Sequence, residues 1–236
     1  MSTVVAELPD KKTPVTREQV VETLWKAWQG FFGSTPKRES IWLLASQWAL
    51  ETGWGRAMHN FNLGNVKSRA GDGYDYQFYA CNEILEKAEA ERLHEADPEH
   101  AKISSTRSDG KCIIWFYPNH PGCRFRAFQT LLAGATDYIA LLSKRFDKAW
   151  PAIDAGDPVE FSRLLRSQRY FTADLAGYTS QIASIFKTFS KLPFDYDALP
   201  IMTATEKAEL DSVIALSMSD LASSVIENAD TEPKGD

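Results

Sequence analysis

The sequence predicts a mainly α fold of the α+β class, on the basis of two periodic patterns. In the first and last thirds of the 236 residues, apolar side chains recur every three or four positions, which is the spacing of a helix with one buried face. In the middle third, aromatic and polar side chains alternate over residues 74–79, and residues 111–117 are the most strand-like stretch. We therefore expect a helical domain that carries a small β-lobe of two or three strands.

Two helices are expected before residue 52. Thr16 is a suitable N-cap for the first helix, and the glycines at 30 and 33 end it. The second helix opens at Thr35-Pro36, because proline is tolerated in a first helical turn. The buried stripe of the first helix is expected to contain Val20, Val21, Leu24, Trp25 and Trp28.

Glu51 lies on the apolar face of the second helix. Ile41, Leu44 and Trp48 recur at helical spacing, Glu51 follows three residues later, and Gly53 then ends the helix. A carboxylate in an apolar stripe is costly unless the stripe opens into a cleft. Apolar surroundings and the negative end of the helix dipole both raise the pKa of such a carboxyl. A carboxyl that stays protonated near neutral pH suits a general acid, whereas the plain alternative is an exposed Glu at a helix end.

The middle third should form the β-lobe. After the strand at 74–79, Cys81-Asn82-Glu83 leads into a charged helical stretch that stops before Pro98. Residues 97–110 read as a loop, residues 111–117 as a strand, and residues 123–126 as its continuation after a turn.

The last third returns to helices. Amphipathic spacing predicts a helix over residues 128–142, another after the cap Asp157, and a core helix that holds Leu175 to Phe189. The expected division is a flexible arm (1–14), a catalytic domain (15–194) and a linker with a C-terminal helix and disordered tail (195–236). That last helix, capped by Thr203 and Glu206, would pack on the domain or on a partner.

Composition excludes several classes. The net charge of −6 argues against nucleic-acid binding, and no apolar run is long enough for a membrane span. The N-terminus lacks the basic and apolar segments of a conventional signal peptide. The four histidines have no metal-ligand spacing and no phosphate loop is present, so we expect neither metal nor cofactor. The three cysteines allow either one disulfide or three reduced thiols.

Four segments resemble a known family. The sequence ALETGWG around Glu51, followed by NFNLGNVK, is similar to the ALESGWG and NLFGIK motifs of glycoside hydrolase family 73, the flagellar-type and autolysin-type glucosaminidases of the lysozyme-like fold. The segments CRFRAFQTLLAGATDYIALL and RYFTADLAGYTSQI resemble two later elements of that family. The resemblance covers residues 16–192 and departs at Leu63 to Val66. It implies that Glu51 is the catalytic acid.

The resemblance also implies a second carboxylate on the small lobe. Glu83 lies 32 residues after Glu51 and is the candidate, although it would equally suit a helix start. Its competitors are Asp72, Asp75 and Glu86. If none serves, the substrate's own 2-acetamido group could replace it.

Four further residues are candidates for substrate binding. Trp54 could stack on a sugar or close the core, and Asn62 and Asn65 could bind N-acetyl groups or form turns. In the last element, the tyrosine that lines the family's cleavage subsite corresponds to Phe171, or to Tyr170 if the register slips by one residue. Tyr178 matches a later tyrosine and is expected in the core.

We therefore expect a peptidoglycan hydrolase that cuts β-1,4 bonds as an N-acetylglucosaminidase. The alternatives are a muramidase or lytic transglycosylase on the same fold, or a non-catalytic wall-binding or virion module. The expected route is synthesis in the cytoplasm and delivery to the cell wall, in the periplasm, by a phage or a secretion machine. An immunity protein or a component of the phage or secretion machine would then be the partner.

Overall fold

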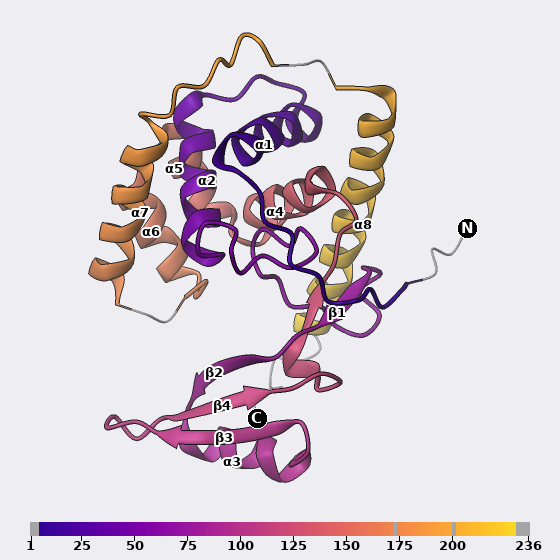
Figure 1. The fold of residues 1–236 in the computed structure, drawn as a ribbon, viewed down its shortest axis with the longest axis vertical. Helices are drawn as coiled ribbons and strands as arrows, with labels where there is room; N and C mark the ends of the chain where they lie inside the picture. The colour runs from indigo at the N-terminus through magenta and orange to yellow at the C-terminus, as the bar shows by residue number, and fades with distance from the viewer. Residues whose placement is uncertain (1–4, 172–173, 200–201, 230–236) are drawn as a thin grey trace. The chain divides into compact units, whose positions relative to one another are not determined.

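The computed structural model describes residues 5–171, 174–199 and 202–229, which group into two compact units (Figure 1). The β unit comprises residues 65–127 and the N-terminal residues up to Lys11, and the helical unit comprises residues 12–64 and those from 128 onward. Helices predominate over strands in the described residues, so the predicted mainly α, α+β class is confirmed.

The helical unit contains most of the helices. They are α1 (Arg17–Phe32), α2 (Arg38–Glu51), α4 (Leu131–Arg145), α5 (Trp150–Ala155), α6 (Pro158–Ser167), α7 (Leu175–Phe189) and α8 (Ala204–Ala229), with a 3₁₀ turn η2 (Asp147–Ala149). The predicted cap of α1 is confirmed, because the Thr16 hydroxyl accepts from the Gln19 N–H while the Gln19 side chain accepts from the Thr16 N–H. Gly33 ends α1 with φ of 66°, while Gly30 lies inside the helix.

The core of the helical unit forms where α1, α2, α4 and α7 meet. Its largest fully buried side chains include Leu24, Ile41, Trp48, Tyr138 and Phe189. The stripes predicted for the first two helices are therefore the buried ones. Because α2 is buried along most of its length, its end is held firmly in place.

The C-terminal helix α8 packs on α1 and α4. Gly30 is needed for this contact, since a Cβ at that position would lie 2.2 Å from Leu210 Cδ1. Thr203 and Glu206 form the predicted reciprocal cap. This helix was expected to pack either on its own domain or on a partner. Its described side chains pack on its own domain. The limits 15–194 for a catalytic domain stay a prediction.

The β unit holds two antiparallel sheets. Strands β1 (Tyr76–Phe78) and β5 (Arg124–Arg126) pair with each other, and β2 (Cys81–Leu85), β4 (Cys112–Phe116) and β3 (Ala101–Thr106) form a three-stranded sheet in that order. Helix α3 (Lys87–Ala96) lies against β3 and β4 (Figure 1), and a 3₁₀ turn η1 (Pro121–Cys123) precedes β5. The expected small lobe is thus built from a two-stranded and a three-stranded sheet.

Two local predictions in the middle third are wrong. Residues 101–106 form strand β3 although a loop was predicted, because this edge strand is polar and contributes only Ile103 as a large apolar side chain. Glu83 lies inside strand β2 and not at the start of a helix, since α3 begins only at Lys87. Residues 82–85 form a strand because they pair with residues 112–115, and a pairing between such distant segments cannot be predicted from a local pattern.

The N-terminal segment, expected as a flexible arm, is hydrogen-bonded where it is described. The Leu8 N–H donates to the Tyr76 carbonyl, and the Tyr76 N–H donates to the Ala6 carbonyl, next to β1. In the helical unit, the Thr13 N–H donates to the Met58 carbonyl and the Thr13 hydroxyl accepts from the Phe61 N–H. The end predicted to be disordered is residues 227–236, of which 227–229 belong to α8. Residues 1–4 and those from 230 lie outside the described residues.

Candidate active site

Glu51 is the last residue of α2, as predicted, and the chain turns sharply after it. Thr52 caps the helix: its N–H and its hydroxyl both donate to the Trp48 carbonyl, and the hydroxyl accepts from the Gly55 N–H. Gly53, Trp54 and Gly55 then have φ values of 56°, 62° and 77°. Three consecutive residues are thus in the left-handed region, and the chain leaves the helix axis directly after the partly buried Glu51.

The pKa of Glu51 is raised to about 7 by burial of its carboxyl, while a hydrogen bond from Tyr178 opposes the shift. The Glu51 side chain is only partly exposed, and its neighbours belong to the apolar core of the helical unit. The predicted rise in pKa is therefore present. At neutral pH a large fraction of this carboxyl carries a proton that it can donate.

Tyr178 on α7 is the direct partner of Glu51. Its hydroxyl donates to Glu51 Oε1 at 3.5 Å, and Phe171 stacks on its ring with centroids 3.8 Å apart. Behind it, the Tyr138 hydroxyl donates to Gln47 Oε1 at 2.6 Å. Tyr178 was predicted as a core residue, and it is buried, but its hydroxyl also reaches the candidate acid. The only sequence signal for this role was the later tyrosine of the fourth resembling segment.

Tyr170 and Phe171 both lie near Glu51. Phe171 lies against Tyr178, as described above, and the ring of Tyr170 packs edge-on against Phe146 at 4.8 Å. Burial raises the pKa of Tyr170, and the nearby Glu51 carboxylate adds to that rise. The structure thus places both residues that compete for the family's tyrosine position around the candidate acid, with the hydroxyl on Tyr170.

Trp54 and Asn62 occupy different environments. Trp54 is partly exposed, and its ring stacks on Phe189 with centroids 5.7 Å apart. Asn62 is only 1% exposed, so a sugar cannot reach its side chain unless the loop moves. The loop is pressed against α4, because a Cβ at Gly134 would lie 1.9 Å from the Phe61 carbonyl oxygen. The side chain of Asn62 is therefore part of the packed interior and not of a surface that a sugar can contact.

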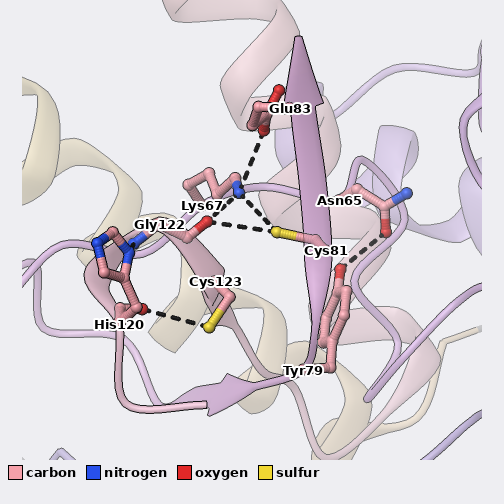
Figure 2. A network of polar contacts seen from close by, with 8 residues as sticks. All are labelled: Asn65, Lys67, Tyr79, Cys81, Glu83, His120, Gly122 and Cys123. Carbon is pink, nitrogen blue, oxygen red and sulfur yellow. Dashed lines mark hydrogen bonds and ion pairs between the residues drawn. The ribbon is translucent and has the colours of Figure 1, made fainter. Parts of the chain in front are cut away.

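Glu83 belongs to the β unit and is exposed. Its carboxylate pairs with Lys67 Nζ at 3.4 Å, and Lys67 also donates to the Gly122 carbonyl (Figure 2). Asn65, in the same unit, accepts a hydrogen bond from the Tyr79 hydroxyl at 3.4 Å, so its side chain has a structural partner (Figure 2). Lys67 and Glu83 lie on the wall of a pocket of about 470 Å³, whose other lining residues are Ser68, Arg69, Ala70, Phe78, Phe116, Asn119, Pro121, Gly122 and Arg124.

The competing acids are engaged elsewhere in the β unit. Asp72 accepts from Ser68, Arg69 and Tyr74 within a turn, and Asp75 accepts from the Ala6 N–H. Glu86 pairs with Lys111 at 2.7 Å. Of these four acids, Glu83 alone lines the pocket of about 470 Å³.

The cysteines are all free thiols, which is one of the two states that the sequence left open. Cys81 receives a hydrogen bond from Lys67 Nζ at 3.4 Å, and the Cys123 thiol donates to backbone carbonyls including that of His120 (Figure 2). Within residues 5–171, 174–199 and 202–229, no three histidine, cysteine or acidic side chains are grouped as metal ligands would be. The helices in the same ranges include none with the length and apolar character of a membrane span.

Comparison of the chain with protein-family models, with curated proteins and with solved structures finds no match. The residues around Glu51, and the resemblance of their sequence, are therefore the grounds for assigning a function to the chain.

Proposed function

We propose that this protein hydrolyses β-1,4 glycosidic bonds of peptidoglycan, as an N-acetylglucosaminidase with Glu51 as the general acid. The observation that carries the proposal is the partly buried Glu51 carboxyl, whose pKa is raised to about 7 at the end of α2. Its position in the ALETGWG segment is the position of the catalytic acid in the family that the sequence resembles.

The proposed chemistry begins with a proton transfer. Protonated Glu51 gives its proton to the glycosidic oxygen, the bond to the anomeric carbon breaks, and positive charge develops on the sugar. Water then adds to the anomeric carbon and releases a proton, so that one water is consumed for each bond cut. The Tyr178 hydroxyl stabilises the Glu51 carboxylate that remains after the transfer, because it donates to Oε1.

Glu83 is the proposed second carboxylate. It lines a pocket beside Lys67 in the β unit, and a carboxylate there could activate water or stabilise the sugar cation. Trp54 and Tyr170, which are both partly exposed, would contact the sugars next to the bond that is cut.

A second candidate is a lytic transglycosylase or a muramidase that uses one acid only. Burial raises the pKa of Glu51 to about 7, and a mechanism that uses this acid alone needs no second carboxylate, which favours the alternative. In a transglycosylase the sugar's own hydroxyl replaces water, and the product is an anhydro-sugar.

The deciding experiment is digestion of purified peptidoglycan by the wild type, Glu51→Gln and Glu83→Gln, with the fragments identified by mass spectrometry. Fragments with a reducing N-acetylglucosamine end, absent with Glu51→Gln, support the proposal. A reducing N-acetylmuramic acid end or an anhydro-sugar supports the second candidate. If the wild type releases nothing, the protein is a binding or virion module.

The site of action is proposed to be the cell wall, reached by phage-type or secretion-type delivery. We expect lysis when the protein is exported to the periplasm of a test bacterium and none when it stays in the cytoplasm. Lysis from neither compartment, with normal accumulation of the protein, contradicts this part of the proposal. Co-purification from the producing cell would then reveal any immunity protein or phage component.

A further inference from the structure

A cationic pocket lies between the start of α1 and the end of α7 in the helical unit. Its volume is about 500 Å³ and its lining residues are Arg17, Ser184, Lys187, Thr188, Lys191, Leu192 and Pro193. Three of the seven carry a positive charge and none carries a negative one, although the chain as a whole has a net charge of −6. Such a local excess of one charge attracts ligands of the opposite sign.

The three cations of the pocket have no ion pair with any residue that the structure describes. Carboxylates pair with Lys26, Lys37, Lys67, Lys87 and Lys111, but with neither Arg17, Lys187 nor Lys191. All three side chains are exposed to solvent. They are therefore available to an anionic ligand without the loss of an internal salt bridge.

Helix stability explains only part of this charge. Lys187 lies in the last turn of α7, where a cation is favourable to the helix dipole. Arg17 is the first residue of α1, where the positive end of the dipole disfavours a cation. Arg17 therefore adds positive charge to the pocket at a position that the helix dipole disfavours, although the neighbouring Glu18 carboxylate attracts it.

The pocket belongs to the same compact unit as Glu51. Helix α7 carries Tyr178, which bonds to Glu51, and Lys187 lies nine residues further along it, or about 14 Å along the helix axis. The same end of α7 carries Phe189, on which Trp54 stacks. Nine residues are two and a half helical turns, so Lys187 projects from the side of α7 opposite Tyr178, and a glycan strand held at Glu51 reaches the pocket only by passing around the C-terminal end of α7.

We propose that this pocket binds the carboxylates of a peptide that hangs from the bound glycan strand. This inference rests on the proposed function, because it assumes that the strand is peptidoglycan. The stem peptide of that polymer carries several free carboxylates, and Arg and Lys are the side chains that bind them. The pocket would favour strands that still carry their peptides over bare glycan.

The test compares two substrates and two matched variants. Sacculi free of phosphate polymers are used either intact or after an amidase has removed the peptides. Lys187→Glu/Lys191→Glu reverses the charge of the pocket, and Lys144→Glu/Lys148→Glu makes the same charge change at two exposed lysines outside it. We expect the pocket variant to raise KM about threefold to tenfold on intact sacculi and to leave stripped glycan unaffected. The control variant should behave as the wild type on both.

Equal losses on both substrates, or no loss on either, overturn the inference while the proposed function stands. If the wild type cuts neither substrate, the proposed function fails. Calorimetry with a soluble stem pentapeptide then tests the inference without any measurement of activity. Binding to the wild type and the control variant, with none to the pocket variant, supports the inference. Absence of binding to the wild type refutes it. Inorganic phosphate serves as a competitor in that titration, and displacement at equal concentration shows a general anion site and contradicts peptide recognition.

Discussion

The carboxyl groups of Glu51 and Glu83 stand in opposite surroundings. Glu51 ends a buried helix among apolar side chains and its pKa is raised to about 7, whereas Glu83 lies on an exposed strand beside the ammonium of Lys67. Burial raises the pKa of the first carboxyl, whereas the second lies in solvent within an exposed ion pair. The difference teaches that position in the fold, and not residue type, makes Glu51 the candidate proton donor.

The pH dependence of the rate should show this difference most strongly. If Glu51 must be protonated, kcat/KM should fall about tenfold for each pH unit above about 7, because only the protonated fraction can donate. The measurement is the rate of release of fragments from sacculi between pH 5 and 9. A rate that is flat up to pH 9 would show that the proton comes from another group.

The stability of Glu51→Gln should differ from that of the wild type above pH 5. The unfolded Glu51 loses its proton near pH 4.5 and the folded one near pH 7, so the folded state binds the extra proton and the wild type loses stability as the pH rises between these values. We expect the variant to be more stable by up to about 3 kcal/mol at pH 8 and similar to the wild type at pH 4. Urea unfolding at the two pH values measures the difference. An equal stability at both would mean that burial of Glu51 costs nothing.

Tyr178→Phe tests how much the hydroxyl of Tyr178 contributes to the pKa of Glu51. The hydrogen bond from Tyr178 lowers the pKa of Glu51, so its loss should move the alkaline limb of the rate profile upward, by less than one pH unit because the bond is 3.5 Å long. The ring of the new Phe keeps the stack on Phe171. Phe171→Leu, which removes the stack but leaves the hydroxyl, is the matched control. A limb that moves downward contradicts the assigned role.

Glu83→Gln should have the smallest effect on stability. Its ion pair with Lys67 is exposed, and such pairs contribute about 0–1 kcal/mol. We expect thermal unfolding to change by no more than that, with a larger loss of activity if Glu83 is the second carboxylate. Unchanged activity with unchanged stability would leave Glu51 as the only catalytic carboxyl.

Sequence reasoning located Glu51 because its placement is local. The spacing from Ile41 to Trp48 defines the helical face, and Gly53 marks the end of the helix, so the position of the carboxyl follows from neighbours within one segment. Its raised pKa also depends on burial by distant segments such as α7, which the apolar spacing indicates only in direction. Strand β3 was not predicted because an edge strand needs few apolar residues. The role of Tyr178 was not predicted because it depends on a contact with Glu51, which lies 127 residues away in the sequence. The helical spacing of Tyr178 indicates only that its side chain is buried.

The left-handed turn at residues 53–55 also limits which residues can follow the candidate acid. Gly53 and Gly55 permit the turn, and Gly55 has no room for a Cβ because it would lie 2.9 Å from the Trp48 ring. Gly53 has open space where a Cβ would lie, and the neighbouring Trp54 adopts a similar left-handed φ of 62°, so steric exclusion acts at Gly55 and not at Gly53. The indole of Trp48 thus restricts which residue can follow the candidate acid four positions later, and any side chain at position 55 would push the turn away from the end of α2.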